Sequence, residues 1–334
     1  MPRSPAFSRA RPFRNRATVN RDELHARIRR LIFASTALSE AFTRGEFRSI
    51  FKGRGVDFEA LREYDEGDDA RLIDWNVSVR LAKPFIRLYR EDRSLTLFLL
   101  IDVSASMEAG SGELSKRDMA VLASSLLAYA AQLRGMPVGA LIFSGEPLRY
   151  FEPRRGKAHA LALIEAAVAA DSRTAAQGLV SRRAAAAGRG SARSSVEAPA
   201  AGSDLPGAFD TAGRILKRRS LVIASSDFFA AGYMPSLARL ARRHDVVALR
   251  LRDDLDGKLP GAGAFTLHDA EGGERLWMPL RSRRLRAAWA DFHEAEDRRF
   301  EEACVAARVP RLELDTACDP ALALLEFFGR RRRG

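Results

Sequence analysis

The sequence predicts an α/β fold in which a doubly wound, largely parallel sheet follows an N-terminal helical and irregular extension. Short apolar runs typical of strands alternate along the chain with segments of helical periodicity, which indicates βαβ units. Two of the runs, residues 95–101 and 221–225, are apolar except for Thr96 and Ser225, as in strands that are buried on both faces. Such units place helices on both sides of one sheet.

Size and composition limit the classes of protein that this chain can be. Its 334 residues suffice for two modest domains or for one domain with a substantial extension. The longest largely apolar stretch, residues 95–103, is far shorter than the roughly 20 residues of a membrane span. The arginine-rich N-terminus precedes no apolar segment that would form the core of a secretory signal. We therefore expect no transmembrane helix and a cytoplasmic location.

The formal net charge of +12 favours an acidic partner. Much of the excess lies in a basic disordered leader, residues 1–19, and a basic tail, residues 329–334, both expected to be solvated. Nucleic-acid binding is not favoured, because the basic residues are not interleaved with aromatic ones. Cys304 and Cys318 have no Cys or His at a zinc-site spacing, so we interpret them as packing residues.

Residues 20–93 form the predicted N-terminal extension. A helix is expected over residues 22–43, with Asn20 or Asp22 as its cap. From residue 45 to residue 93 the chain is dense in glycine, charged and aromatic residues without a sustained period. We expect this part to be compact and irregular, with short strands such as residues 85–89.

The predicted sheet domain covers residues 94–328. Its segment 181–201 is nearly all Ala, Gly, Ser and Arg, which bury too little apolar surface to offset chain ordering, so it is expected to be a flexible insertion. A small hairpin is expected at residues 265–267 and 275–278. Strands are predicted at residues 95–101, 138–143, 148–151, 221–225, 246–251 and 312–314, and helices at 116–133, 157–170, 205–217, 235–243, 283–307 and 320–328.

A D-x-S-x-S motif follows the first buried strand, with Asp102, Ser104 and Ser106 in the three named positions. In a doubly wound sheet, ligands bind beyond the carboxyl ends of the strands, which is where this motif falls. A carboxylate and two hydroxyls offer hard oxygen ligands of low total charge, which suit Mg²⁺. The motif therefore predicts a divalent-metal site with one coordination position left open to a carboxylate from a partner.

Two further segments support this site. Residues 221–225 lead to Asp227, which we expect to act through water or through a hydrogen bond to another ligand. Ser203 precedes a predicted helix and its hydroxyl is a third candidate ligand, whereas Asp204 can equally be only a helix cap. Each element is weak alone, because Asp and Ser are common turn residues, but their order favours a site. The alternative is a domain that keeps this shape without binding metal.

The chain resembles domain-of-unknown-function family 58, a bacterial family that is similar to von Willebrand factor A domains. The resemblance covers about residues 48–328. Its most specific part lies upstream of the metal motif and reads GRGVDF at residues 53–58, REY at 62–64 and GDDARLIDWN at 67–76, followed by Arg80.

The resemblance implies a fold of the von Willebrand factor A type and a metal-ion-dependent adhesion site built from Asp102, Ser104, Ser106, Ser203 and Asp227. The family usually has Thr in place of Ser203, so we expect a somewhat looser site, because serine lacks the methyl group that restricts the rotamer. Genes of this family commonly neighbour those of MoxR-type AAA+ ATPases. That association implies an adaptor in chaperone-like assembly or maturation of protein complexes.

The charged residues of the upstream string have two interpretations. They form either a surface for a partner or an ion-pair network that holds the N-terminal segment to the sheet, and we favour the network. Trp75 is then an anchoring core residue. The charged residues concerned are Asp68, Asp69, Arg71, Asp74 and Arg80.

We interpret the chain as a binding module and not an enzyme. Bound Mg²⁺ (or Mn²⁺) accepts an acidic residue of a partner protein, and a MoxR-type AAA+ ATPase is the expected partner. One alternative is a metal-dependent hydrolase that uses Asp102 and Asp227, although the sequence has no G-x-S-x-G elbow, no P-loop and no histidine near either strand end. The other is a basic nucleic-acid-binding protein, for which affinity would be sensitive to salt and carried by the terminal arginines.

Overall fold

The computed structural model describes residues 20–43, 56–65, 73–81, 83–91, 95–145, 147–170, 203–257, 259, 264–268, 275–279 and 282–329. The leader predicted at residues 1–19 and the insertion predicted at residues 181–201 lie outside the described residues. Of the predicted tail, only Gly329 is described.

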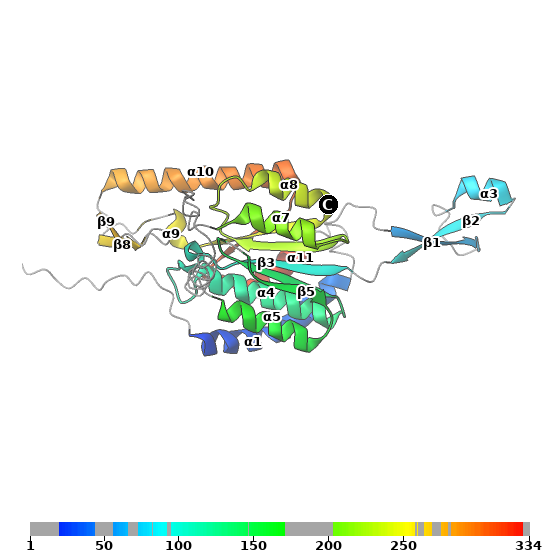
Figure 1. Ribbon diagram of the computed structural model, residues 1–334, viewed down its shortest axis with the longest axis horizontal. Coiled ribbons are helices and arrows are strands. Elements are labelled where there is room, and N and C mark those ends of the chain that lie inside the picture. Colours follow the sequence, from blue (N-terminus) through cyan, green and yellow to red (C-terminus); the bar gives the residue numbers. More distant parts are fainter. Residues whose placement is uncertain are drawn as a thin grey trace, which may run out of the picture.

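A six-stranded sheet lies at the centre of the molecule, in the strand order β10-β7-β6-β3-β4-β5 (Figure 1). All neighbouring strands pair in parallel except β4 and β5, which are antiparallel. The prediction of an α/β protein with a largely parallel sheet is therefore confirmed. The strands are β3 (Thr96–Asp102), β4 (Val138–Phe143), β5 (Pro147–Arg154), β6 (Ser220–Ser226), β7 (Asp245–Arg252) and β10 (Arg311–Asp315).

Helices cover both faces of the sheet, because the central strands are apolar on both sides. Side chains alternate across a strand, so Leu97 and Leu99 of β3 join one buried cluster, and Phe98 and Leu100 join the other. The first cluster is closed by α4 (Lys116–Leu133), α5 (Lys157–Ala169) and α11 (Pro320–Gly329), with α1 (Arg21–Thr43) packed on them. The second is closed by α7 (Leu205–Ile215), α8 (Met234–Arg243) and α10 (Arg283–Ala307).

Local hydrogen bonds explain where the helices begin. The Asn20 carbonyl accepts the Leu24 amide at 3.0 Å, and its side chain accepts the Asp22 amide at 2.6 Å, so Asn20 is the cap of α1. Ser115 and Asp118 form a reciprocal capping box at the start of α4. The predicted hairpin is present as β8 (Ala264–His268) and β9 (Arg275–Pro279), while the short helices η2 (Ala105–Glu108) and α9 (Asp254–Gly257) were not predicted. No helix among the described residues has the length and apolarity to cross a membrane.

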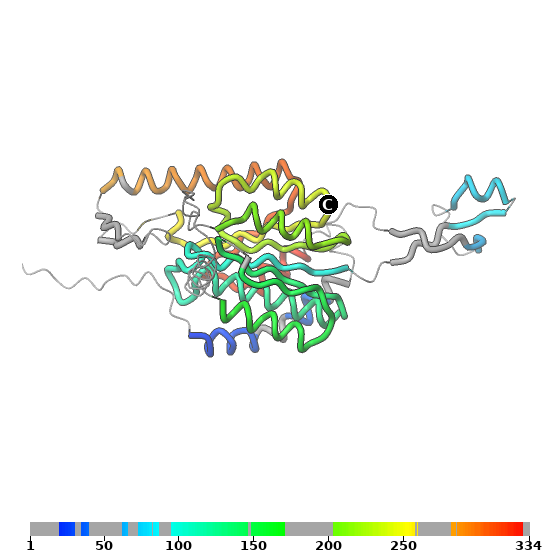
Figure 2. The backbone as a smooth tube through the Cα atoms, viewed as in Figure 1, coloured from blue at the N-terminus to red at the C-terminus, as the bar shows by residue number. Residues whose placement is uncertain are grey.

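Three elements form an arm that lies apart from the sheet: β1 (Val56–Glu63), α3 (Trp75–Leu81) and β2 (Phe85–Glu91) (Figures 1 and 2). The two strands pair antiparallel over their whole length. The prediction of an irregular segment was therefore wrong for β1 and α3 and correct for the strand near residues 85–89. Apolar and charged residues alternate from residue 56 to residue 59, a pattern that is typical of a strand with one buried face and that indicates the start of β1.

The interpretation of Trp75 as a core residue is also wrong, since 67% of its surface is exposed. The residues that hold α3 in place are polar. Asp74 is buried and accepts the Asn76 amide at 3.1 Å, and the hydroxyl of buried Ser78 accepts the Phe85 amide at 2.8 Å. Because these hydrogen bonds fix the helix on β2, its apolar side chains are not needed to anchor it. Asp68, Asp69 and Arg71 lie outside the described residues.

Candidate metal centre

Asp102 is the last residue of β3, and its carboxylate is buried at the carboxyl edge of the sheet. The register of β3 and β6 pairs Ile101 with Ser225, so Ser226 comes next to Asp102. The Ser226 hydroxyl donates a hydrogen bond of 2.7 Å to Asp102 Oδ2. The Ser203 hydroxyl donates to the same oxygen at 2.6 Å from the segment before α7. Three separate segments therefore meet at one carboxylate.

The turn after β3 brings the two remaining serines of the motif to the site. The Ser104 amide donates to Asp102 Oδ1 at 2.9 Å, which is an Asx-type turn that the side chain of Asp102 makes with its own backbone. The Ser104 and Ser106 hydroxyl oxygens are 3.3 Å apart. Ser104 is buried, whereas Ser106 and Ser203 are half-buried, so the site is open to solvent where these two serines lie.

Asp227 contributes a second buried carboxylate at the end of β6. Its Oδ1 accepts the Phe229 amide at 3.2 Å, and its Oδ2 has no hydrogen-bond partner among the described residues. Phe228 adopts a φ of 59°, a left-handed conformation that is costly for a residue with a bulky side chain and that sharpens this turn. Burial, together with the charge of Asp227, raises the pKa of Asp102 to about 6, although hydrogen bonds from Ser203, Ser226 and Ser104 act in the opposite direction.

The donor set fits a hard divalent cation. Two buried carboxylates lie together, and no Lys or Arg in the described part of the chain pairs with either of them. Such a pair is unfavourable unless a positive charge compensates it. The surrounding donors are the hydroxyl oxygens of Ser104, Ser203 and Ser226. Hard oxygen donors of this kind suit Mg²⁺ or Mn²⁺.

Two buried cations support the turn that carries Asp227. Arg250 Nε donates to the Asp227 carbonyl at 3.3 Å, and its guanidinium lies over the rings of Phe229 and Phe300 at 5.7 and 4.8 Å from their centroids. Lys116, which is 2% exposed, lies 5.1 Å from the centroid of Phe229 and pairs with Asp256 at 2.7 Å. Neither cation was recognised in the sequence, where each looked like an ordinary charged residue beside an apolar run.

The structure thus brings four of the five predicted ligands into one hydrogen-bonded group: Asp102, Ser104, Ser106 and Ser203. Asp227 lies beside them, where its charge acts on Asp102. Asp204 caps α7 by accepting the Gly207 amide at 2.8 Å. Ser226 is the residue that the sequence analysis did not select, although its place at the end of a buried strand next to Asp227 was the available signal.

Comparisons with known proteins place the chain in a family but do not supply a function. The model of the family described as "Protein of unknown function DUF58" matches residues 60–299. Uncharacterized proteins of Mycobacterium bovis and Mycobacterium tuberculosis are each 30% identical over 325 residues, which cover 96% of this chain and 93% of theirs. An uncharacterized protein of Mycobacterium avium is 34% identical over 136 residues, 39% of this chain and 78% of that protein.

Among solved structures, a conserved hypothetical protein BatB from Bacteroides thetaiotaomicron aligns at 12% identity with a TM-score of 0.43, covering 72% of this chain and all of that one. The pilus adhesin SpaC from Lactobacillus rhamnosus GG aligns at 9% identity with a TM-score of 0.36, covering 72% of this chain and 30% of that one. Both TM-scores are below 0.5, so neither alignment assigns a more specific fold type.

Proposed function

The chain belongs to the DUF58 family of proteins of unknown function, and we propose that it is a metal-dependent protein–protein interaction module of the von Willebrand factor A type. The observation that supports this most directly is that the hydroxyls of Ser203 and Ser226 both donate to the buried carboxylate of Asp102. Beside it, the Oδ2 of Asp227 has no hydrogen-bond partner in the part of the chain that the structure describes. A bound Mg²⁺ or Mn²⁺ would supply the positive charge that these two carboxylates lack and a point of attachment for a further oxygen ligand.

The residues of this chain have separate tasks in the proposed function. Asp102, Ser104 and Ser106 would hold the metal directly, and Ser203 and Ser226 would either join them or orient the carboxylate. The carboxylate of Asp227 would balance part of the positive charge of the metal. Arg250 holds the turn that carries Asp227 in place. Because Ser106 and Ser203 are the half-buried members of the group, the partner would approach from the side of the site where these two serines lie.

We propose that the partner presents an acidic residue and that it is a MoxR-type AAA+ ATPase, for which this chain acts as an adaptor in chaperone-like assembly or maturation of protein complexes. The support for the acidic residue is chemical: a hard cation held by few charges favours another carboxylate oxygen. The support for the ATPase is the family resemblance alone. In this role the protein would bind its partner and would not catalyse a reaction.

Calorimetric titration of Mg²⁺ into chelator-stripped protein, with Asp102→Ala in parallel, tests the metal site. We expect saturable binding to the wild type and none to the variant, with unchanged circular dichroism. Absence of Mg²⁺ and Mn²⁺ binding in the wild type would overturn the proposal.

The partner is tested with a purified MoxR-type AAA+ ATPase. Binding that requires Mg²⁺, is lost with chelator and is lost in Asp102→Ala is the expected result. Binding that survives both changes would assign the contact to another surface. Turnover of phosphate or ester substrates that depends on Asp102 would instead favour the hydrolase.

A further inference from the structure

A third strand of the sheet also leads into buried carboxylates at the carboxyl edge. Asp253 follows β7 and Asp256 lies in the short helix α9, and the two residues are 4% and 9% exposed. Burial by itself would raise the pKa of Asp253, but hydrogen bonds from Thr316 and Ser111 together lower it, so this carboxylate stays ionised. Both carboxylates therefore act as charged acceptors, and the groups that donate to them indicate their task.

The donors come from the segment that connects the D-x-S-x-S motif to α4. The amide and the hydroxyl of Ser111 donate to Asp253 Oδ2 at 2.8 and 3.0 Å. The ammonium group of Lys116, which is 2% exposed, donates to Asp256 Oδ1 at 2.7 Å. The Asp253 amide donates to Asp256 Oδ2 at 2.9 Å, which joins the two carboxylates. We call the two contacts, Ser111–Asp253 and Lys116–Asp256, the latch.

The latch is separated from the predicted metal ligands by one short loop. The Ala109 carbonyl accepts the Lys116 amide at 2.9 Å, and the Ala109 amide donates to the Ser106 carbonyl at 3.3 Å. Gly110 allows the loop to close, since a Cβ atom at this position would clash with the carbonyl oxygen of Leu114. Two backbone hydrogen bonds therefore link the position of Ser106 to that of Lys116.

Lys116 also contacts the turn that carries the second carboxylate of the site. Its Nζ atom lies 5.1 Å from the centroid of the Phe229 ring, and the Phe229 amide donates to Asp227 Oδ1 at 3.2 Å. Helix α9 is in turn fixed to α10, because the Trp289 indole N–H donates to the Leu255 carbonyl at 2.9 Å (Figure 1). One buried ammonium group thus connects α9 with both segments that carry the predicted ligands.

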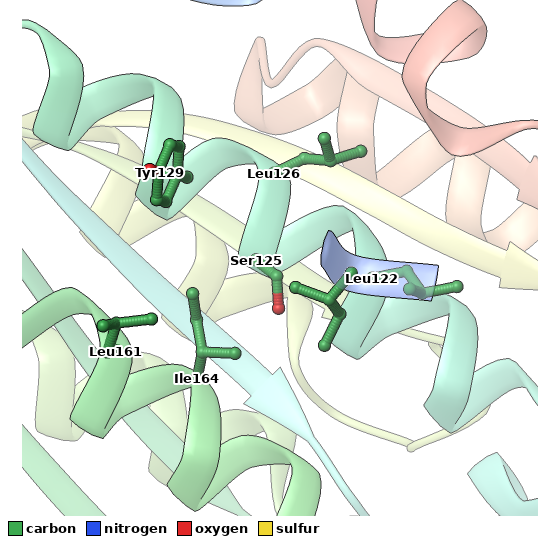
Figure 3. Close-up of a pocket in the computed structure, with 7 residues that line it drawn as sticks. Leu122, Ser125, Leu126, Tyr129, Leu161 and Ile164 are labelled. Atoms are coloured by element: carbon green, nitrogen blue, oxygen red, sulfur yellow. The ribbon is translucent and has the colours of Figure 1, made fainter. Parts of the chain in front are cut away.

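The remainder of α4 is held in a different way. Beyond its first turn the helix packs against α1 and α5 by apolar contacts, and Leu122, Leu126 and Ile164 line a small pocket there (Figure 3). This packing does not involve the latch. Loss of the latch should therefore change the first turn of α4 and the loop before it, and leave the rest of the helix in place.

We propose that Ser111 and Lys116, held by Asp253 and Asp256, are positioning residues for the metal site. The latch keeps the loop after the motif and the turn of Asp227 in one arrangement, so that their oxygen atoms face the same ion. These residues act through the ligands and not on the metal itself. The proposal rests on the metal site that is proposed above.

Lys116→Met tests the proposal, because charge and positioning predict opposite effects. Loss of a positive charge at this edge of the sheet would by itself strengthen Mg²⁺ binding, whereas loss of the latch weakens it. We expect calorimetric titration to give an affinity at least about threefold weaker than that of the wild type. Leu122→Ala, in the same helix, should lower the melting temperature but keep the affinity. Unchanged or tighter binding by Lys116→Met would overturn the proposal.

Two glycines of the loop provide a matched pair of variants without a change of charge. Gly110→Ala forces the loop apart, because the added Cβ meets the backbone of residue 114. A Cβ atom at Gly112 meets no atom within 4 Å. We expect Gly110→Ala to weaken Mg²⁺ binding and Gly112→Ala to keep the affinity of the wild type. Equal affinities of the two variants would also overturn the proposal.

Hydrogen–deuterium exchange in the presence of chelator tests the latch independently of any metal. In Lys116→Met we expect faster exchange in residues 104–110 and in residues 227–230, with wild-type rates in β3 and β6. Faster exchange in only one of the two segments, or in neither, would show that the latch does not couple them. A wild type that binds no Mg²⁺ would overturn the proposed function, and the exchange pattern would still decide whether the latch exists.

Discussion

The Ser203 hydroxyl donates a hydrogen bond of 2.6 Å to Asp102 Oδ2, although 101 residues separate the two in the sequence. This contact joins the segment before α7 to the end of β3. The hydroxyl of a serine rotates more freely than that of a threonine, because serine lacks the methyl group that restricts the rotamer. The residue type at position 203 should therefore affect the affinity of the site for metal.

Replacement of Ser203 should separate the roles of its oxygen and of its rotamer. We expect Ser203→Ala to weaken Mg²⁺ binding roughly fivefold, in line with the loss of about 1 kcal/mol for one hydrogen bond. Ser203→Thr should bind Mg²⁺ as well as the wild type or more tightly, since the added methyl restricts the hydroxyl. Calorimetric titration measures both, and equal affinity in all three proteins would remove Ser203 from the site.

Neighbouring serines at the end of β6 provide a matched pair of variants. Ser226 donates to Asp102, whereas the buried hydroxyl of Ser225 has no partner among the described residues. We expect Ser226→Ala to weaken Mg²⁺ binding by a factor of about 5 to 10. Ser225→Ala should leave the affinity unchanged and keep or slightly raise the melting temperature, because it removes an unsatisfied polar group. Equal effects of the two would indicate a general packing defect and not a ligand.

The raised pKa of Asp102 predicts how metal-free protein responds to pH. A carboxylate whose pKa rises from 3.8 to about 6 on folding stabilises the fold at pH values below 3.8, and that contribution is lost as the pH rises through about 6. In chelator, the melting temperature should therefore fall between pH 4 and pH 7 by more in the wild type than in Asp102→Asn. Thermal unfolding followed by circular dichroism measures the difference, and identical pH profiles would contradict this prediction.

The same pKa predicts a proton-coupled affinity for the metal. Below about pH 6 the ion must displace the proton of Asp102, so the affinity for Mg²⁺ should fall by up to about tenfold for each further pH unit. Titrations in buffers of different ionisation enthalpy would detect the released proton. An affinity that is constant between pH 5 and pH 7 would show that Asp102 is already ionised in the metal-free protein.

Arg250 should matter for the metal site without touching it. It is 2% exposed, pairs with Asp297 at 2.8 Å and donates to the Asp227 carbonyl. Arg250→Ala removes this ion pair, the hydrogen bond to the Asp227 carbonyl and the contacts with the rings of Phe229 and Phe300, so it should lower the free energy of unfolding by about 2 to 3 kcal/mol and also weaken Mg²⁺ binding. Arg252 pairs with the same Asp297 but is 31% exposed, so Arg252→Ala should cost about 1 kcal/mol or less. Urea denaturation compares the two.

Periodicity and apolar runs were sufficient to predict most of the sheet domain. Lys116–Leu133 and Val138–Phe143 have the predicted bounds, because each is specified by its own pattern of side chains. The position of the D-x-S-x-S motif could be predicted for the same reason. The strand before the motif is so apolar that it must lie in the middle of the sheet, and ligands bind at the carboxyl edge of such a sheet.

Contacts between distant segments were decided only by the tertiary structure. The sequence named Ser203 and Asp227 as candidates, but the alignment of β3 with β6 determined that Ser226 also reaches Asp102. The same limit explains Trp75, which by composition belongs in a core. Its helix is held by the hydrogen bonds of Asp74 and Ser78, so its ring is free to face solvent. Local pattern fixes which segments are helices and strands, whereas burial and charge depend on which neighbours the folded chain brings within a few ångströms.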